Sequence, residues 1–465
     1  MIDLTYMPAT ELAAKIKNGE VSAVEAVTAA LDRIDVTTPS LNAVVQITPE
    51  AALDEARDAD RRRAAGAEAG ALDGIPMTVK DNLDVAGVIS TGGTAGRRTF
   101  VPEHDATVVA RAKAAGAIVL GKTNTPELTL AYETDNIVYG PTNNPYDTSR
   151  TTGGSSGGSA ANLAVGGASF EIGSDTGGSL RVPSHYCGTA AIRPTSGRVP
   201  RAGHILPPYG ALEALTTIGP MARTIADVEL LLPVLAGSDW QDPAVADMPL
   251  LPSRDVDIST LRVAMYVDNR VIPASAETAA IVWDAARALE QAGATVEEAV
   301  PPGIEEGFGL FLSLLGADGG AAVGALLELY GTTEPSPFLI HLGELLADFS
   351  VPTPGDFDGV LLQWGLFKVS MLAFIANYDL VLTPVTPTPA VPHGATFNED
   401  VLPGFSYTAV YNLTGWPAAV VRAGTSDDGL PVGVQIAATP WREDRALAAA
   451  RVIERALGGF VPPEL

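Results

Sequence analysis

The chain has 465 residues, of which 46% are hydrophobic and 18% charged, so it can fill a substantial core and is not an intrinsically disordered protein. The formal net charge of −26 argues against nucleic acid as the main partner, because phosphate binding needs a basic face. The single cysteine cannot form an internal disulfide, and no basic region followed by an apolar run opens the chain, so we expect a cytoplasmic protein without a signal peptide.

The N-terminal part of the chain predicts helices over its first 65 residues. Ser22 and Glu25 have the spacing of a capping box, and apolar residues then recur at helical intervals. The pattern changes near residue 70, where apolar residues alternate over residues 75–79. This alternation predicts a short strand that ends at Lys80.

The remaining elements alternate between strands and helices, which predicts an α/β fold with a mixed, mostly parallel sheet. Helical patterns cover residues 106–115, 276–293 and 442–457, and strand patterns cover residues 117–120, 263–267, 294–300, 380–382, 418–421 and 432–436. We expect one domain over residues 1–465, made of a helical part (1–65), a core (66–240), a variable section (241–375) and a return to the core (376–465).

An apolar stretch at residues 307–327 is long enough to span a bilayer. It contains Asp318 and several glycines, and no basic flank or aromatic belt accompanies it. We therefore expect a buried or substrate-lining helix there and no membrane partner.

Two segments rich in glycine and serine carry the candidate chemistry. Residues 151–159 contain four glycines and lead into a helix-like run, which favours a turn that approaches a ligand closely over a flexible linker. In residues 173–184, successive small residues can point backbone N–H groups into one concavity, as an oxyanion hole or a phosphate-binding nest requires.

Two motif matches fail on their context. Residues 116–123 match the P-loop pattern, but the intervening residues have the pattern of a buried strand and Pro126 interrupts the helix that should follow. Residues 153–157 match the nucleophile elbow of α/β-hydrolases, but no apolar strand precedes them, and His341 and His393 are the only late histidines. A Ser/His esterase of that type is kept as an alternative. The five scattered histidines and the lone cysteine predict no metal site.

The chain resembles the amidase signature enzymes over nearly its whole length. The matching pieces are residues 74–82, 153–159, 173–184, 193–198, 218–223, 412–417 and 429–435. The resemblance implies a mixed sheet of about eleven strands with helices on both faces, and it implies no cofactor.

The resemblance also implies individual roles. Ser179 is expected to be the nucleophile, and Ser155, after a cis peptide bond, is expected to bridge it to Lys80. Backbone N–H groups are expected to form the oxyanion hole, Asp175 and Arg181 to brace its loop, and Ser156 to help hold Lys80. The oxyanion-hole donors are those of Thr176, Gly177, Gly178 and Ser179, and the expected substrate contacts are Tyr132, Glu133, Thr134 and Gly154.

The residue types suit amide cleavage. A serine hydroxyl is a poor nucleophile without a base, and a lysine becomes a usable base only when burial lowers its pKa. We expect Lys80 to take a proton through Ser155 as Ser179 attacks a carbonyl. Ser155 then protonates the leaving amine, and water hydrolyses the acyl-enzyme.

Two classes of function compete on this chemistry. The sequence at residues 201–219 favours a free-standing amidase, a monomer or homodimer that cleaves small-molecule amides and also esters or carbamates (urethanes). The alternative is the glutamine-dependent amidotransferase subunit that acts on aminoacyl-tRNA within a multi-subunit complex. The intact Lys80, Ser155 and Ser179 argue against a third possibility, a binding protein without catalysis.

The substrate pocket is expected to come from four variable segments, residues 93–100, 127–136, 204–212 and 307–345. The last of them is apolar and could act as a mobile lid. Its surroundings hold aromatic residues that fit either an apolar substrate or plain core packing, namely Phe308, Phe311, Tyr330, Phe338 and Trp364.

Overall fold

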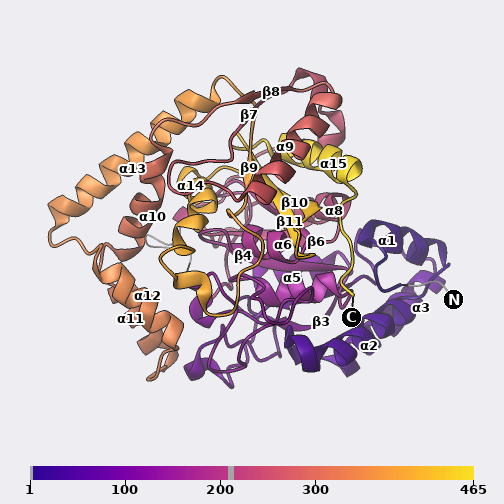
Figure 1. The fold of residues 1–465 in the computed structure, drawn as a ribbon. Helices are drawn as coiled ribbons and strands as arrows, with labels where there is room; N and C mark the ends of the chain where they lie inside the picture. The colour runs from indigo at the N-terminus through magenta and orange to yellow at the C-terminus, as the bar shows by residue number, and fades with distance from the viewer. Residues whose placement is uncertain (1–3, 208–213, 465) are drawn as a thin grey trace.

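The computed structural model describes residues 4–207 and 214–464. One eleven-stranded sheet runs through its centre, in the order β1-β3-β2-β4-β6-β5-β10-β11-β9-β7-β8 (Figure 1). The strands are β1 (Val44–Ile47), β2 (Pro76–Lys80), β3 (Ile118–Thr123), β4 (Phe170–Asp175), β5 (Ala190–Arg193), β6 (Thr217–Ala222), β7 (Arg262–Met265), β8 (Thr295–Glu298), β9 (Leu380–Pro384), β10 (Ala418–Thr425) and β11 (Pro431–Ala438).

The mixed α/β sheet that the sequence predicts is confirmed, with a different balance of strand directions. Of the ten neighbouring pairs among these strands, six are antiparallel and four parallel. Residues 116–123, which match the P-loop pattern, lie in and just before the buried strand β3, as the apolar run at residues 117–120 indicates. Of the antiparallel pairs, β10 and β11 are joined by a short connection over residues 426–430, whereas β4 and β6 pair across a connection that contains β5.

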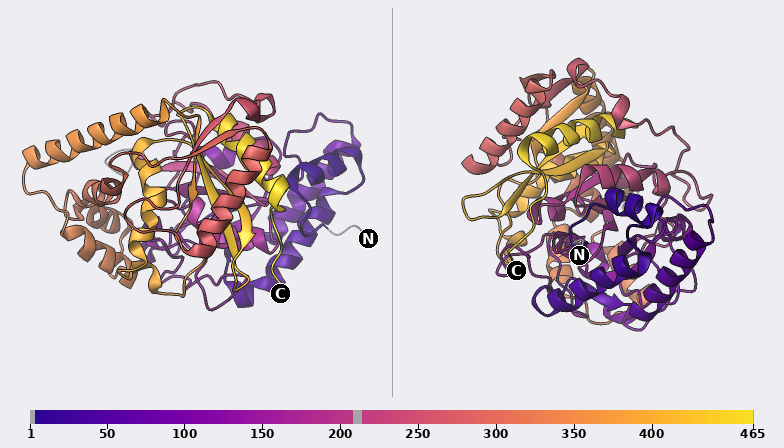
Figure 2. Two further views of the ribbon diagram at one scale, coloured as in Figure 1. Left: turned by 45° about the horizontal axis from the view of Figure 1, so that its top comes forward. Right: turned by 90° about the vertical axis from the view of Figure 1, so that its right-hand side faces the viewer.

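Helices cover both faces of the sheet (Figures 1 and 2). They are α1 (Ala9–Asn18), α2 (Ala23–Leu41), α3 (Pro49–Ala64), α4 (Thr107–Ala114), α5 (Gly157–Ala164), α6 (Arg181–Tyr186), α8 (Ile225–Leu235), α9 (Ala276–Gln291), α10 (Gly307–Gly316), α11 (Ala321–Tyr330), α12 (Pro337–Ala347), α13 (Pro354–Ile375), α14 (Ser406–Thr414) and α15 (Glu443–Leu457). The capping box predicted at Ser22 and Glu25 is present at the start of α2.

Side-chain alternation along the strands divides the core into two main layers. Leu380 and Leu382 of β9 pack into the layer that contains apolar residues of α8, α9 and α15. Val381, between them, packs into the opposite layer with residues of α6, α10 and α14. This period of two is the one expected for a strand covered on both faces.

The β2–β4 pair sets the position of the site. These two strands are parallel neighbours, with Thr78 opposite Glu171 and Val79 opposite Ile172. Their carboxyl ends therefore meet at one edge of the sheet, where open α/β sheets commonly bind ligands. Lys80 ends β2 and Asp175 ends β4, so the predicted base lies beside the strand that leads into the second glycine-rich segment, residues 173–184.

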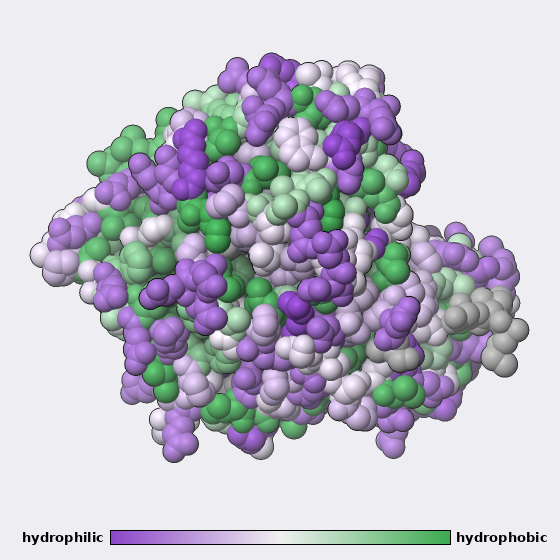
Figure 3. Space-filling model, viewed as in Figure 1, coloured by the Kyte–Doolittle hydropathy of each residue, from purple (hydrophilic) through white to green (hydrophobic). Residues whose placement is uncertain are grey.

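The middle section forms a helical group, α10 to α13, that projects from one side of the sheet (Figure 2). The 307–327 stretch becomes α10 and α11, and the chain from residue 304 to residue 330 bends by 48° between them. Among the described helices, α13 is the one that is long and apolar enough to cross a bilayer by itself, a test that helices of soluble proteins also pass. Leu362, Leu366 and Val369 expose more than half of their surface on it, and apolar side chains gather there in Figure 3.

Candidate active site

Lys80 is fully buried at the end of β2. Its Nζ donates to Ser155 Oγ at 2.6 Å and to Ser174 Oγ at 3.2 Å. Burial lowers the pKa of this lysine well below its usual value, and the carboxylates of Asp175 and Glu171 only partly oppose that effect. Lys80 is therefore held in an environment that favours the neutral amine, which can accept the hydroxyl proton of Ser155.

Ser155 lies in a tightly held loop before α5. The peptide bond between Gly154 and Ser155 is cis, as the resemblance implies. Thr134 fixes the loop from both sides, since its Oγ1 donates to the Gly153 carbonyl at 2.9 Å and accepts from Gly157 N–H at 3.1 Å. Gly154 lies against the backbone of residues 131–133 so closely that a Cβ there would meet backbone atoms at 2.6–2.8 Å.

Ser179 follows β4 by four residues and lies in the wall of a pocket. Its carbonyl accepts a hydrogen bond from Ser156 N–H at 3.2 Å, which ties the two glycine-rich segments together. Ser156 Oγ donates to the Ser174 carbonyl at 3.3 Å rather than binding Lys80. Its support of Lys80, implied by the resemblance, is therefore indirect, through β4.

The Asp175–Arg181 pair braces the loop that carries Ser179. The two side chains are fully buried, and Arg181 donates to both carboxylate oxygens at 2.9 Å. Arg181 also donates to the Thr408 carbonyl, to Gln435 at 2.6 Å and to Asn412. Burial opposes the charge of Asp175, but the Arg181 guanidinium lowers the pKa of this carboxyl well below its usual range.

The backbone N–H groups of the loop divide into two sets. Gly178 N–H donates to Asp175 Oδ1 at 2.9 Å, so this group, expected in the oxyanion hole, is engaged in bracing the loop. The N–H groups of Thr176, Gly177 and Ser179 are left as the candidate oxyanion donors. Gly178 has a φ of +135° and packs against Thr408, which restricts this position to glycine.

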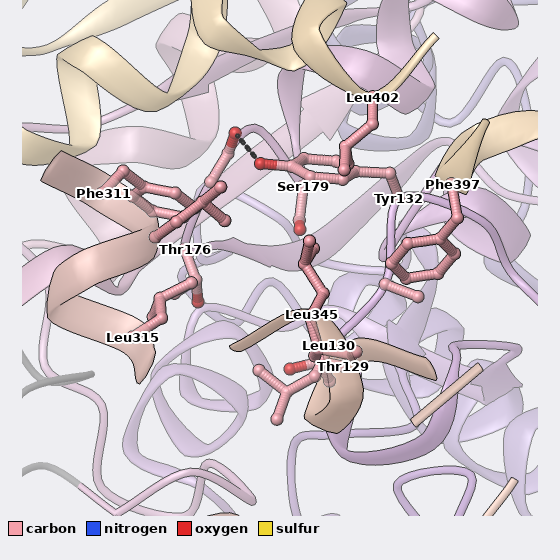
Figure 4. Close-up of a pocket in the computed structure, with 14 residues that line it drawn as sticks. Thr129, Leu130, Tyr132, Thr176, Ser179, Phe311, Leu315, Leu345, Phe397 and Leu402 are labelled. Atoms are coloured by element: carbon pink, nitrogen blue, oxygen red, sulfur yellow. Dashed lines mark hydrogen bonds between the residues drawn. The ribbon is translucent and has the colours of Figure 1, made fainter. Parts of the chain in front are cut away.

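The pocket beside Ser179 is lined mainly by apolar side chains (Figure 4). Residues of the 127–136 and 307–345 segments contribute, as expected, while residues 93–100 do not line it. Of the predicted 204–212 segment, residues 204–207 do not line the pocket, and residues 208–212 lie outside the described residues. The lining residues are Thr129, Leu130, Ala131, Tyr132, Thr176, Gly177, Ser179, Phe311, Leu312, Leu315, Leu342, Leu345, Phe397 and Leu402.

Of the predicted substrate contacts, Tyr132 is the one whose side chain lies in the pocket. Its ring stacks on Phe405 with centroids 3.8 Å apart. Its hydroxyl donates to the Gly177 carbonyl at 3.2 Å, the dashed line in Figure 4. Glu133 is buried and accepts hydrogen bonds from Gly394 N–H at 2.9 Å and from His393 at 3.1 Å. The side chains of Glu133 and Thr134 thus organise loops around the pocket.

Among the predicted aromatic residues, Phe311 lines the pocket. Phe308 belongs to the core, Tyr330 donates to the Ile205 carbonyl, and Trp364 donates to the Leu413 carbonyl. Phe397 and Leu402, which come from loops after β9, were not predicted because isolated apolar residues in a loop carry no sequence signal for a pocket. Phe338 reaches the pocket only through its ring contact with Phe397.

The alternative active sites find no support in the described residues. His393 pairs with Glu133, and His341 is exposed beside Glu344, so both late histidines are engaged away from Ser155. The described residues also contain no group of three or more metal-ligating side chains.

Comparison with known proteins places this geometry in context. The model of the amidase family matches residues 25–447. One subunit of the glutamyl-tRNA(Gln) amidotransferase of Carboxydothermus hydrogenoformans is 34% identical, with 98% of each chain covered. The structure of the corresponding subunit from Thermotoga maritima is 25% identical with a TM-score of 0.83, over 100% of this chain and 99% of that one. A bacterial aryl acylamidase of the amidase signature family is 27% identical with a TM-score of 0.85, over 97% of this chain and 96% of that one.

These relatives correct the expectation of a free-standing amidase that acts on small amides without nucleic acid or other subunits. Seven further relatives, 32–35% identical over 96–100% of this chain, are also named as this subunit of glutamyl-tRNA(Gln) amidotransferase. The expectation rested on one short segment, residues 201–219, whereas the relatives match along nearly the whole chain. Because the amidase family model matches residues 25–447, the chain belongs to the amidase family.

Proposed function

We propose that this chain is the amide-cleaving subunit of a cytoplasmic, glutamine-dependent amidotransferase that acts on glutamyl-tRNA(Gln). The observation that carries the proposal is the similarity to relatives of that name along nearly the full length of both chains. The buried contact between Lys80 and Ser155 supports it, because releasing ammonia from glutamine requires cleavage of an amide.

In the proposed reaction, Ser179 is the nucleophile, Ser155 the proton relay and Lys80 the base. Ser179 Oγ attacks the side-chain amide carbon of glutamine while its proton moves through Ser155 to neutral Lys80. The oxyanion is stabilised by backbone N–H groups of Thr176, Gly177 and Ser179. The C–N bond then breaks, Ser155 returns a proton to the departing ammonia, and water hydrolyses the resulting ester to glutamate and free Ser179.

The charge of the chain supports a division of labour within such a complex. With a net charge of −26, this chain would repel the phosphates of tRNA over most of its surface. We therefore assign the phosphate contacts to a partner subunit that carries a basic face. This chain would supply ammonia to that partner.

The proposal is tested with the chain tagged at its own chromosomal locus. Partner subunits should co-purify with it, and the complex should convert glutamyl-tRNA to glutaminyl-tRNA with glutamine as the nitrogen donor. ATP is supplied, because a carboxylate must be activated before ammonia can attack it. The matched control is Ser179→Ala, which should abolish conversion with glutamine but preserve conversion with added ammonium. Failure of the wild-type chain to bring down any partner, together with no conversion, would contradict the proposal.

A further inference from the structure

The proposed reaction requires a particular orientation of the Lys80 amine. A neutral amine has one lone pair, and a lysine carries it at the end of four flexible carbons. The lone pair must point at the Ser155 hydroxyl for proton transfer, so the two N–H bonds must point elsewhere. A group that binds one of these N–H bonds would hold the amine in the productive orientation.

Ser174 is placed to bind that N–H group. It lies on β4, beside the end of β2, and its Oγ accepts from Lys80 Nζ at 3.2 Å. Ser174 Oγ also accepts from Asn82 Nδ2 at 2.8 Å. Asn82 follows Lys80 by two residues and is buried, so Lys80 and Asn82 both contact Ser174 from the chain at the end of β2.

Asn82 is in turn connected to the ring of His204. Asn82 Nδ2 lies 2.7 Å from His204 Nε2. The turn that carries His204 is also held to the chain around Asn82 by the two backbone hydrogen bonds of the Leu83–His204 bridge. Ile205 N–H donates to the Asn82 carbonyl at 2.8 Å, and Asp84 N–H donates to the Gly203 carbonyl at 2.9 Å. His204 Nδ1 lies 3.2 Å from the Leu206 carbonyl, so the tautomer with its proton on Nδ1 donates there and leaves Nε2 to accept from Asn82 Nδ2.

We propose that His204, Asn82 and Ser174 form a hydrogen-bond chain that positions the amine of Lys80 with its lone pair toward Ser155. They are positioning residues, because Lys80 alone touches the reacting hydroxyl. The inference rests on the proposed function only through the role of Lys80 as the base. It adds three residues whose loss should impair proton transfer without altering the pocket.

The charged groups that face Lys80 determine the expected pH dependence. Asp175 and Glu171 of β4 favour its protonated form, and burial keeps His204 neutral at physiological pH by lowering its pKa to about 3. Ser174 Oγ accepts a hydrogen bond from Lys80, and such a bond favours the charged ammonium over the neutral amine. Removing Ser174 Oγ should therefore lower the pKa of Lys80 further and move the acidic limb of the pH–rate profile to lower pH.

The test measures the reaction of Ser179 with a small alkyl fluorophosphonate, followed by intact mass. In this reaction the Oγ–P bond forms, the P–F bond breaks, fluoride leaves, and the serine proton passes through Ser155 to Lys80. The probe needs neither glutamine nor a partner subunit. Failure of the proposed amidotransferase function therefore leaves this test intact, and Ser179→Ala defines the background.

We expect Ser174→Ala to slow labelling at least about 10-fold at its optimum pH, because the amine lone pair is no longer held toward Ser155. The acidic limb of the pH–rate profile should move to lower pH. Ser174→Thr, which keeps the hydroxyl, should label close to the wild-type rate. Ser184→Ala is the matched control, because Ser184 is equally buried but its Oγ has no hydrogen-bond partner among the described residues.

A second pair of variants tests the far end of the chain. His204→Leu should slow labelling, while His204→Gln, which keeps a polar atom near the position of Nε2, should restore most of the rate. If Ser174→Ala does not fold, as judged by thermal melting, the His204 pair decides. Labelling of a folded Ser174→Ala or His204→Leu variant at the wild-type rate, with an unchanged acidic limb, would overturn the proposal.

Discussion

At the scale of single residues, the site depends on a lysine that is a base only because it is buried. Lys80 has no exposed surface and its pKa lies well below the usual lysine value. A base works when it is unprotonated, so the reaction should be present above the pKa of folded Lys80 and lost as the pH falls through it. The same lysine in water would be charged at neutral pH.

Lys80→Arg tests this dependence on deprotonation. A guanidinium stays protonated at every accessible pH, so we expect labelling of Ser179 by the fluorophosphonate to fall at least about 100-fold and not to recover at high pH. Lys122→Arg is the control, because Lys122 is equally buried on neighbouring β3 but pairs with Asp81. A Lys80→Arg variant that labels as fast as Lys122→Arg would show that Lys80 is not the base.

At the scale of elements, the pocket is a meeting of loops held by a buried carboxylate. Glu133 binds the turn at residues 393–396, and that turn leads directly to Phe397 in the pocket wall. The hydrogen bond to Glu133 raises the pKa of His393. A histidine whose pKa is raised by folding stabilises the protein fully below its unfolded pKa, and the contribution is lost as the pH rises through the folded value.

Glu133→Gln should therefore lower the melting temperature more at pH 5.5 than at pH 9, because the charge interaction with His393 exists only at the lower pH. Thermal melting at the two pH values measures this difference. Glu344→Gln is the control, because Glu344 faces His341 with both side chains more than half exposed. An equal loss at both pH values would mean that Glu133 acts through neutral hydrogen bonds alone.

The elements also show where sequence patterns stop being informative. Strands with apolar alternation, such as β2, or with a continuous apolar run, such as β3, were predicted, whereas β1, β4, β5 and β6 were not. In β4 the pattern is broken by Glu171, which the fold accommodates because hydroxyls of Thr123 and Ser159 bind its carboxylate. That compensation comes from distant segments and is invisible in a local pattern.

The same limit applies to the site. The motif pieces predicted Lys80, Ser155 and Ser179, and the structure brings Lys80 and Ser155 into contact. They did not predict that Gly178 N–H would bind Asp175, or that the loops after β9 would close the pocket with Phe397 and Leu402. The expectation of a free-standing amidase was wrong, because the residues that cleave an amide do not determine which molecule receives the released nitrogen.

At the scale of the whole molecule, charge separates the proposed tasks. The acidic chain by itself should not bind tRNA at physiological ionic strength, whereas the complex with its partner should. Electrophoretic retardation of glutamyl-tRNA by the purified chain and by the co-purified complex at about 150 mM salt measures this difference. Submicromolar binding by the chain alone would show that the phosphate contacts are its own.

The bonds of Arg181 have a consequence for how the enzyme is made. Its partners Thr408, Asn412 and Gln435 are translated 227 to 254 residues after it. A nascent chain that has already emerged with Lys80, Ser155 and Ser179 still lacks the contacts that fix the nucleophile loop. The ribosome must finish almost the entire polypeptide before the loop that carries Ser179 is fixed in place. Prematurely terminated products should therefore not cleave cellular amides.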